Sequence, residues 1–164
     1  MWSYRSIGPA VLAAALLAAC GFHLRGQASL PFDSLYVDGN TALLVELKRN
    51  IAAGTTTRLV DRAADAQAIF AVDREVREKV ILAMDTSGRV REYQLRYRVG
   101  FSVVDGKGRE WIPPDEIQLT RDISFNDQVL AKEAEETLLY REMQTDLVQQ
   151  IVRRLAAARL AREG

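Results

Sequence analysis

Tyr93-Gln-Leu-Arg-Tyr-Arg-Val-Gly-Phe-Ser-Val103 is the stretch of sequence that decides the fold. Apolar side chains hold most of its odd positions and polar or small ones its even positions, which is the period of a half-buried β-strand. Similar alternation runs from Phe70 to Met84 and from Trp111 to Phe125, with Asp-Thr-Ser-Gly and Asp-Gly-Lys-Gly between the runs. Three such runs joined by turn residues predict an antiparallel meander.

Turn length sets the expected register of the meander. A two-residue turn in the first hairpin pairs Val80 with Leu95, and a three-residue loop in the second pairs Tyr97 with Ile117. Both choices bring apolar faces together, whereas a slip of one residue would send an apolar row to the wrong face. Pro113-Pro114 lacks backbone N–H donors, so the third strand is either broken there or lies at a sheet edge.

A small βαβ unit is expected before the meander. Ser34 to Val37 reads as a short strand, and Thr41 can cap a helix that runs to about Ala53, with Gly54 as its stop. Thr57 to Val60 then reads as a second short strand, parallel to the first.

A long helix is expected after the meander, capped by Ser124 or Asn126. One apolar stripe follows its whole length: Leu130, Ala134, Leu138, Leu139, Met143, Leu147, Ile151 and Leu155. We therefore predict an α+β fold in which two helices pack on one face of a mainly antiparallel, mixed sheet of four to five strands.

The N-terminus reads as a targeting segment. Arg5 and a short apolar run make residues 1–19 typical of a secretory signal peptide, too short to span a bilayer. Leu17-Ala-Ala-Cys20 resembles a bacterial lipobox, which predicts an N-acyl, S-diacylglycerol lipid on Cys20; the alternative is an ordinary signal peptide before an incidental free cysteine. Residues 20–33 would then form a lipid-anchored extended tether, and residues 34–162 a single domain.

Composition narrows the class of function. The signal segment holds one basic residue and no acidic one, so the remaining chain carries one net negative charge and gives no case for nucleic acid binding. The chain has one cysteine and one histidine, His23, so we expect no internal disulfide, no metal centre and no catalytic triad. A hydrolase with an unrecognised carboxylate site stays open as an alternative.

Basic residues gather on the face of the meander that the helices leave open. The expected register puts Lys79 opposite Arg96 and Arg77 opposite Arg98, which is unfavourable for like charges. One interpretation is a solvated face neutralised by nearby carboxylates, and the other is a basic surface for an anionic partner. Arg89 and Arg91 at the tip of the first hairpin suit phosphate groups, although exposed tips are commonly charged.

Three stretches carry a family resemblance. Cys20-Gly-Phe-His-Leu-Arg25 resembles the opening of mature LptE proteins, and Arg91-Glu-Tyr-Gln-Leu95 and Val129-Leu-Ala-Lys-Glu133 are similar to later parts of that family. The expected order of elements also follows the family's order, so the resemblance covers essentially the whole chain after residue 19.

The resemblance implies a non-enzymatic role in the outer membrane. LptE proteins plug the LptD β-barrel, assist its assembly and contact lipopolysaccharide. Lys132 matches one basic position that the family uses for lipopolysaccharide, whereas Thr86 occupies the other, so we expect Arg89 or Arg91 to substitute for it. Arg77, Lys79, Arg96 and Arg98 would face the barrel. The different class of answer is a lipoprotein that scaffolds another envelope complex without binding lipopolysaccharide.

Overall fold

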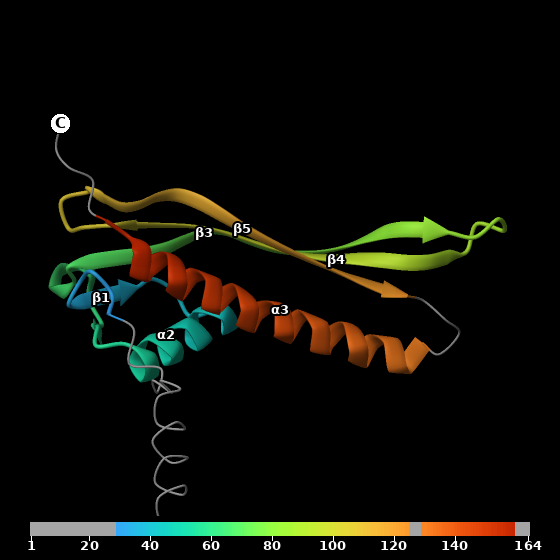
Figure 1. Ribbon diagram of the computed structural model, residues 1–164, viewed down its shortest axis with the longest axis horizontal. Helices are drawn as coiled ribbons and strands as arrows, with labels where there is room; N and C mark the ends of the chain where they lie inside the picture. Colours follow the sequence, from blue (N-terminus) through green and yellow to red (C-terminus); the bar gives the residue numbers. More distant parts are fainter. Residues whose placement is uncertain (1–28, 125–128, 160–164) are drawn as a thin grey trace, which may run out of the picture.

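A computed structural model describes residues 29–124 and 129–159 of the chain. The elements run β1 (Ser34–Val37), α2 (Ala42–Gly54), β2 (Arg58–Leu59), a 3₁₀ turn η2 (Ala63–Asp65), β3 (Ala68–Met84), β4 (Val90–Val104), β5 (Glu110–Ser124) and α3 (Val129–Ala157). Figure 1 shows α3 running lengthwise along the sheet, with α2 and β1 at one end and the tip of the β3–β4 hairpin at the other.

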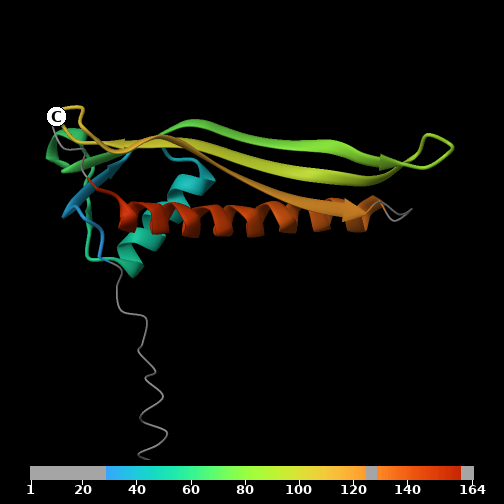
Figure 2. The same cartoon turned by 45° about the horizontal axis from the view of Figure 1, so that its top comes forward.

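One five-stranded sheet has the order β2-β1-β3-β4-β5. β1 pairs parallel with β2 and β3, and β3, β4 and β5 form an antiparallel meander. Both helices lie on the same side of the sheet (Figure 2). The predicted α+β fold class, the βαβ unit and the meander are confirmed.

Helix α2 forms as its sequence predicts. The Thr41 side chain accepts a hydrogen bond from the Leu44 backbone N–H at 3.4 Å, which satisfies one unpaired donor of the first turn. Its buried residues recur at helical spacing and face the sheet: Leu43, Leu44, Leu47 and Ile51.

The register predicted for the first hairpin is wrong by one residue. Val80 lies opposite Gln94 and not Leu95, and Lys79 lies opposite Leu95. The turn holds three residues and not two, because the backbone N–H of Asp85 donates to the carbonyl of Arg89 at 2.8 Å.

A β-bulge restores the core pairing near α2. Val72 lies opposite Phe101 and Arg74 opposite Gly100, so Asp73 is an extra residue on β3. The Asp73 carboxylate fills the space beside Gly100, where an added Cβ would lie 2.9 Å from Asp73 Oδ1. Between Asp73 and the hairpin tip, the β3 positions that continue the apolar row therefore face away from the helices, and the polar positions face them.

The second hairpin keeps its predicted faces but shifts its pairing. Tyr97 lies opposite Leu119, two residues beyond the expected Ile117, because register irregularities fall near Pro113-Pro114. A shift of two residues leaves the same face buried. β5 is an edge strand, which is where the sheet tolerates the two prolines.

The core lies between the sheet and the helices. Its fully buried large side chains come from β1, α2, β3, β4, the C-terminal half of α3 and the segment before β1: Phe32, Leu35, Leu43, Leu47, Ile51, Phe70, Leu95, Tyr97, Phe101, Met143, Leu147 and Ile151. Leu30 is buried as well as Phe32, so the folded unit begins before Ser34, inside the segment predicted as tether.

The predicted stripe of α3 is buried over only part of its length. Met143, Leu147 and Leu155 are fully buried, whereas Leu138 is 54% exposed. Ser124 ends β5 and so does not cap α3, and Asn126 lies outside the described residues.

Candidate functional site

The tip of the β3–β4 hairpin is organised around one carboxylate. Asp85 Oδ1 accepts hydrogen bonds from the Ser87 backbone N–H at 2.9 Å, the Ser87 hydroxyl at 2.6 Å and the Arg89 backbone N–H at 2.9 Å. Gly88 takes the positive φ of 80° that closes the turn, a conformation that glycine adopts without steric cost. One carboxylate oxygen thus shapes the turn.

The second carboxylate oxygen holds two guanidinium groups. Asp85 Oδ2 lies 3.2 Å from Arg89 Nε and 3.1 Å from Arg91 Nη2, and the two arginine side chains are 74% and 55% exposed. Hydrogen bonds from the Ser87 hydroxyl and the Arg89 backbone lower the pKa of Asp85 to about 2, so the carboxylate stays charged at neutral pH. The cluster of Asp85, Arg89 and Arg91 therefore carries one net positive charge, and Glu92 is the next residue on β4.

The turn between β4 and β5 repeats this architecture. Asp105 Oδ1 accepts from the backbone N–H groups of Lys107 at 2.8 Å and Arg109 at 2.9 Å, and Asp105 Oδ2 accepts from Arg109 Nε at 2.8 Å. Burial raises the pKa of Asp105, but the hydrogen bonds from Arg109 and Lys107 outweigh it and leave that pKa below its ordinary value. The residue two places after Arg109 is Trp111, so this turn has no counterpart of Arg91.

Sequence analysis missed Asp85 as an organising residue. The signal was present, because both turns read Asp-x-x-Gly-Arg, at residues 85–89 and 105–109. A carboxylate four residues before an arginine, with glycine between them, is the pattern that both turns share.

The start of α3 lies toward the same end of the molecule as the hairpin tip (Figures 1 and 2). Lys132 falls in the first turns of this helix, but its side chain lies outside the described part of the chain. Cys20 and His23 also fall outside the described residues.

The four basic residues predicted on one open face are divided between two faces. The three-residue turn and the bulge at Asp73 place Lys79 opposite Leu95 and Arg77 opposite Tyr97, on the helix-covered side. The expected opposition of like charges is therefore wrong.

Arg77 and Lys79 contact α3. Arg77 Nη2 donates to the Tyr97 hydroxyl and to Gln144 Oε1, both at 2.9 Å, and its guanidinium lies 4.4 Å from the centre of the Tyr97 ring. Lys79 Nζ pairs with Glu136 Oε2 at 2.6 Å. These two cations hold the helix to the hairpin.

Tyr97 extends this polar contact toward α2. Its hydroxyl donates to Glu75 Oε1 at 2.6 Å, and Glu75 Oε2 accepts from the Thr41 hydroxyl at 2.9 Å. Burial of the ring raises the pKa of Tyr97 strongly, and the hydrogen bond to Glu75 raises it further. The phenol therefore remains neutral and serves as a fixed link between strands.

Arg96 and Arg98 lie on the open face, where polar neighbours pair with both. Arg98 Nη2 lies 2.8 Å from Glu78 Oε1, and Arg96 Nε donates to Gln94 Oε1 at 2.8 Å. Gln94 in turn donates to Asp122 at 3.1 Å. Of these two arginines, Arg98 is paired with a carboxylate, whereas Arg96 is bound by a neutral amide; Arg98 Nε is buried without a hydrogen-bond partner.

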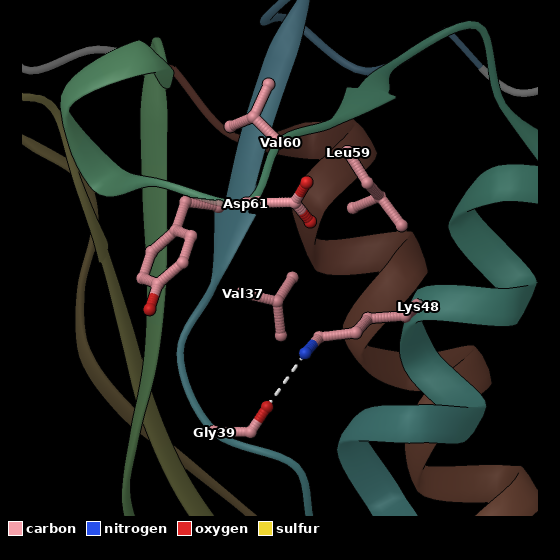
Figure 3. A pocket seen from close by; sticks show the side chains of 7 residues that line it. Val37, Gly39, Lys48, Leu59, Val60 and Asp61 are labelled. Carbon is pink, nitrogen blue, oxygen red and sulfur yellow. Dashed lines mark hydrogen bonds between the residues drawn. The ribbon is translucent and has the colours of Figure 1, made fainter.

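A cleft between α2 and the β1–β2 edge also has charged residues in its walls, Lys48 and Asp61. Figure 3 shows Lys48 reaching across it toward Gly39, and Lys48 Nζ donates to the Gly39 carbonyl at 2.8 Å. Asp61 in the same lining balances the charge of Lys48, whereas Asp85 is paired with two arginines, so the cleft offers a weaker anion site than the hairpin tip.

Residues 29–124 and 129–159 show neither a metal-binding cluster nor a membrane-spanning helix. Within those ranges no group of three His, Cys, Asp or Glu side chains is placed to hold a metal ion. No helix there has the length and apolarity needed to cross a membrane.

Comparison with known proteins gives concordant matches. A family profile described as "LptE: Lipopolysaccharide-assembly" matches residues 32–155. The LPS-assembly lipoprotein LptE of Photorhabdus laumondii is 28% identical over 152 residues, covering 88% of this chain and 81% of that protein. The protein of the same name from Pectobacterium atrosepticum is 30% identical over 152 residues, covering 88% and 80%.

Solved structures share the fold. The solution structure of an uncharacterized lipoprotein B from Nitrosomonas europaea superposes with a TM-score of 0.73 at 42% identity, covering 84% of this chain and 91% of that one. The crystal structure of the rare lipoprotein B from Shewanella oneidensis gives 0.66 at 26% identity, covering 76% and 94%.

Proposed function

The chain belongs to the LptE family of lipopolysaccharide-assembly proteins, and on that premise we propose that it is an outer-membrane lipoprotein that takes part in lipopolysaccharide assembly. The family match over residues 32–155 carries this proposal, and two relatives named LPS-assembly lipoprotein LptE agree with it. Its role is binding and assembly without catalysis: it plugs an LptD-like β-barrel and contacts lipopolysaccharide.

Lipopolysaccharide contact is assigned to the hairpin tip together with Lys132. Arg89 and Arg91 are held side by side on Asp85 with most of their surfaces exposed. Guanidinium groups make bidentate, charge-assisted hydrogen bonds to phosphate, which suits the anionic head group of lipopolysaccharide.

The open sheet face is assigned to the barrel lumen. Arg96 and Arg98 form hydrogen bonds and ion pairs with Gln94 and Glu78, so this face presents polar groups with little net charge. The interior of an outer-membrane barrel is polar, which suits such a surface. Arg77 and Lys79 leave the partner-facing set, because they contact α3.

The membrane anchor is assigned to acylated Cys20. A lipid chain contributes about 0.8 kcal/mol for each buried methylene, and two or more chains give stable anchoring. Cys20→Ala should release the protein from the outer-membrane fraction, which fractionation followed by immunoblotting would detect.

Affinity purification of the full-length, acylated protein from native outer membranes tests the barrel assignment. Recovery of a stoichiometric, large β-barrel protein that survives detergent would support it. Recovery of the lipoprotein with other envelope proteins and no barrel would favour the scaffolding alternative.

Binding of the full-length protein to purified lipopolysaccharide tests the second assignment. The double variant Arg89→Ala, Arg91→Ala should bind more weakly than wild type, and Lys132→Ala should weaken binding further. Unchanged binding by the double variant would contradict the assignment to the hairpin tip.

A further inference from the structure

The two oxygens of Asp85 serve different partners. Oδ1 accepts three hydrogen bonds from Ser87 and Arg89 that shape the turn. Oδ2 faces the guanidinium groups of Arg89 and Arg91 at 3.2 and 3.1 Å. Asp85 therefore lies between two exposed cationic side chains.

The β4–β5 turn shows which contacts of Asp85 belong to the turn architecture and which are particular to the β3–β4 tip. Asp105 Oδ1 accepts from two backbone N–H groups, and Asp105 Oδ2 accepts from Arg109 Nε, as Asp85 does from Arg89. The arginine that follows glycine is thus accounted for by the turn itself. Arg91 is the addition, because Trp111 occupies the corresponding place after the second turn.

We propose that Asp85 is a positioning residue that holds Arg91 at the hairpin tip as the cation that contacts the phosphate groups of lipopolysaccharide, while Arg89 primarily completes the turn. This inference rests on the proposed lipopolysaccharide binding and deepens it. Arg91 contacts Asp85 through Nη2, and a guanidinium has five N–H donors, so its other donors can reach a phosphate.

Preorganisation is the physical reason for an acid at this place. A free arginine side chain loses rotamer freedom when it binds a ligand, and this loss weakens binding. The Asp85 carboxylate restricts the side chain before the ligand arrives and keeps two like-charged guanidinium groups close together. A low pKa keeps Asp85 ionised throughout the physiological pH range.

Asp85 could have the opposite effect on binding, because as an anion it would compete with phosphate for the arginines. Asp85→Asn distinguishes the two roles. The asparagine side-chain oxygen can still accept the turn hydrogen bonds at the Oδ1 position, whereas an amide NH₂ at the Oδ2 position is a donor and cannot bind guanidinium. A positioning carboxylate predicts weaker lipopolysaccharide binding by this variant, and a competing one predicts tighter binding.

The test uses the full-length protein, purified lipopolysaccharide and the same lipopolysaccharide after enzymatic removal of its phosphates. Arg91→Ala should weaken binding to the phosphorylated form by about tenfold, the loss expected for one charge-assisted contact. Asp85→Asn should weaken it several-fold. Arg91→Lys should recover part of the loss, because it keeps the charge without the planar fork.

Matched controls come from the second turn. Asp105→Asn and Arg109→Ala make the same chemical changes in the same turn architecture at the other end of the sheet, so lipopolysaccharide binding should stay at the wild-type level. Amide NMR spectra of each variant report whether its hairpin still forms.

The outcomes separate the inference from the function on which it rests. An Arg91→Ala effect that disappears with dephosphorylated lipopolysaccharide supports the inference, and an effect that persists overturns it in favour of a structural role. If the wild type binds lipopolysaccharide and Arg91→Ala binds it equally well, or Asp85→Asn binds it more tightly, the inference is overturned and the proposed function stands. No binding by the wild type overturns both.

Discussion

The two halves of α3 meet the sheet in different ways. In the proximal half, near α2, Met143, Leu147 and Ile151 are fully buried against apolar strands. In the distal half, toward the hairpin tip, contact is made by polar groups such as Lys79 with Glu136, and the Tyr140 hydroxyl with the Glu78 carbonyl at 2.8 Å. Directional bonds occur along both halves, for example between Asp146 and Arg121 in the proximal one, but among the described residues the large fully buried side chains of α3 lie in the proximal half alone.

This difference separates stability from orientation. Apolar burial contributes free energy roughly in proportion to area and does not depend on direction. Hydrogen bonds and ion pairs contribute less on balance but fix geometry. The proximal half therefore stabilises the fold, while the distal half sets how the hairpin and the start of α3 lie next to each other.

A matched pair of leucine truncations tests whether the two halves of α3 contribute differently to stability. Leu147→Ala removes a fully buried side chain and should lower the free energy of unfolding by about 2–5 kcal/mol. Leu138→Ala, on the same helix but 54% exposed, should change it by less than about 0.5 kcal/mol. Urea unfolding followed by circular dichroism measures both, and equal losses would contradict the division of α3 into two halves.

The phenol of Tyr97 lies where the two halves meet. Tyr97→Phe keeps the buried ring but deprives Glu75 and Arg77 of a shared partner, and should cost about 1–3 kcal/mol of stability. Tyr140→Phe is the matched control, since it removes a single hydrogen bond to the Glu78 carbonyl and should cost about 0.5–1.5 kcal/mol. The reverse order of the two losses would show that Tyr97 does not link the strands as described.

The ion pair between Lys79 and Glu136 tests what holds the distal half of α3 to the hairpin. The Lys79 and Glu136 side chains are 35% and 26% exposed, so Glu136→Gln should cost less than about 1 kcal/mol, and less still at high salt. Amide hydrogen exchange should nevertheless speed up in α3 before Met143 and stay unchanged after it. Faster exchange along the whole helix would mean that the two halves open together.

Sequence patterns sufficed for elements whose signals are local. Thr41 and Gly54 bracket α2, and its apolar spacing selects the buried face. Glycines at the turns and paired prolines on an edge strand likewise act within a few residues. Cross-strand parity was predicted correctly for the second hairpin and wrongly for the first, because the first turn holds one residue more than predicted.

The division of the basic residues could not be read in the same way. Val76 and Val80 continue the apolar row begun by Phe70, yet they lie opposite Arg98 and Gln94 on the open face. A single extra residue at Asp73 exchanges the faces of β3, and the alternation itself carries no mark of it. The space that Gly100 leaves for the Asp73 carboxylate is a tertiary feature, visible only once the strands are paired.

Acidification should produce the smallest effect and compares the two Asp-x-x-Gly-Arg turns. The pKa of Asp85 falls from an ordinary 3.8 to about 2 on folding, so its contribution to stability is complete above pH 4 and is lost as the pH falls toward 2. The pKa of Asp105 is also lowered, but its turn adjoins the packed proximal half, where Trp111 contacts the buried ring of Phe32. The protection factors of the Ser87 and Arg89 amides should therefore fall at a higher pH than those of Lys107 and Arg109. Loss of both turns at one pH would show that hydrophobic packing lends the second turn no extra protection, and no change is expected at either turn between pH 5 and pH 8.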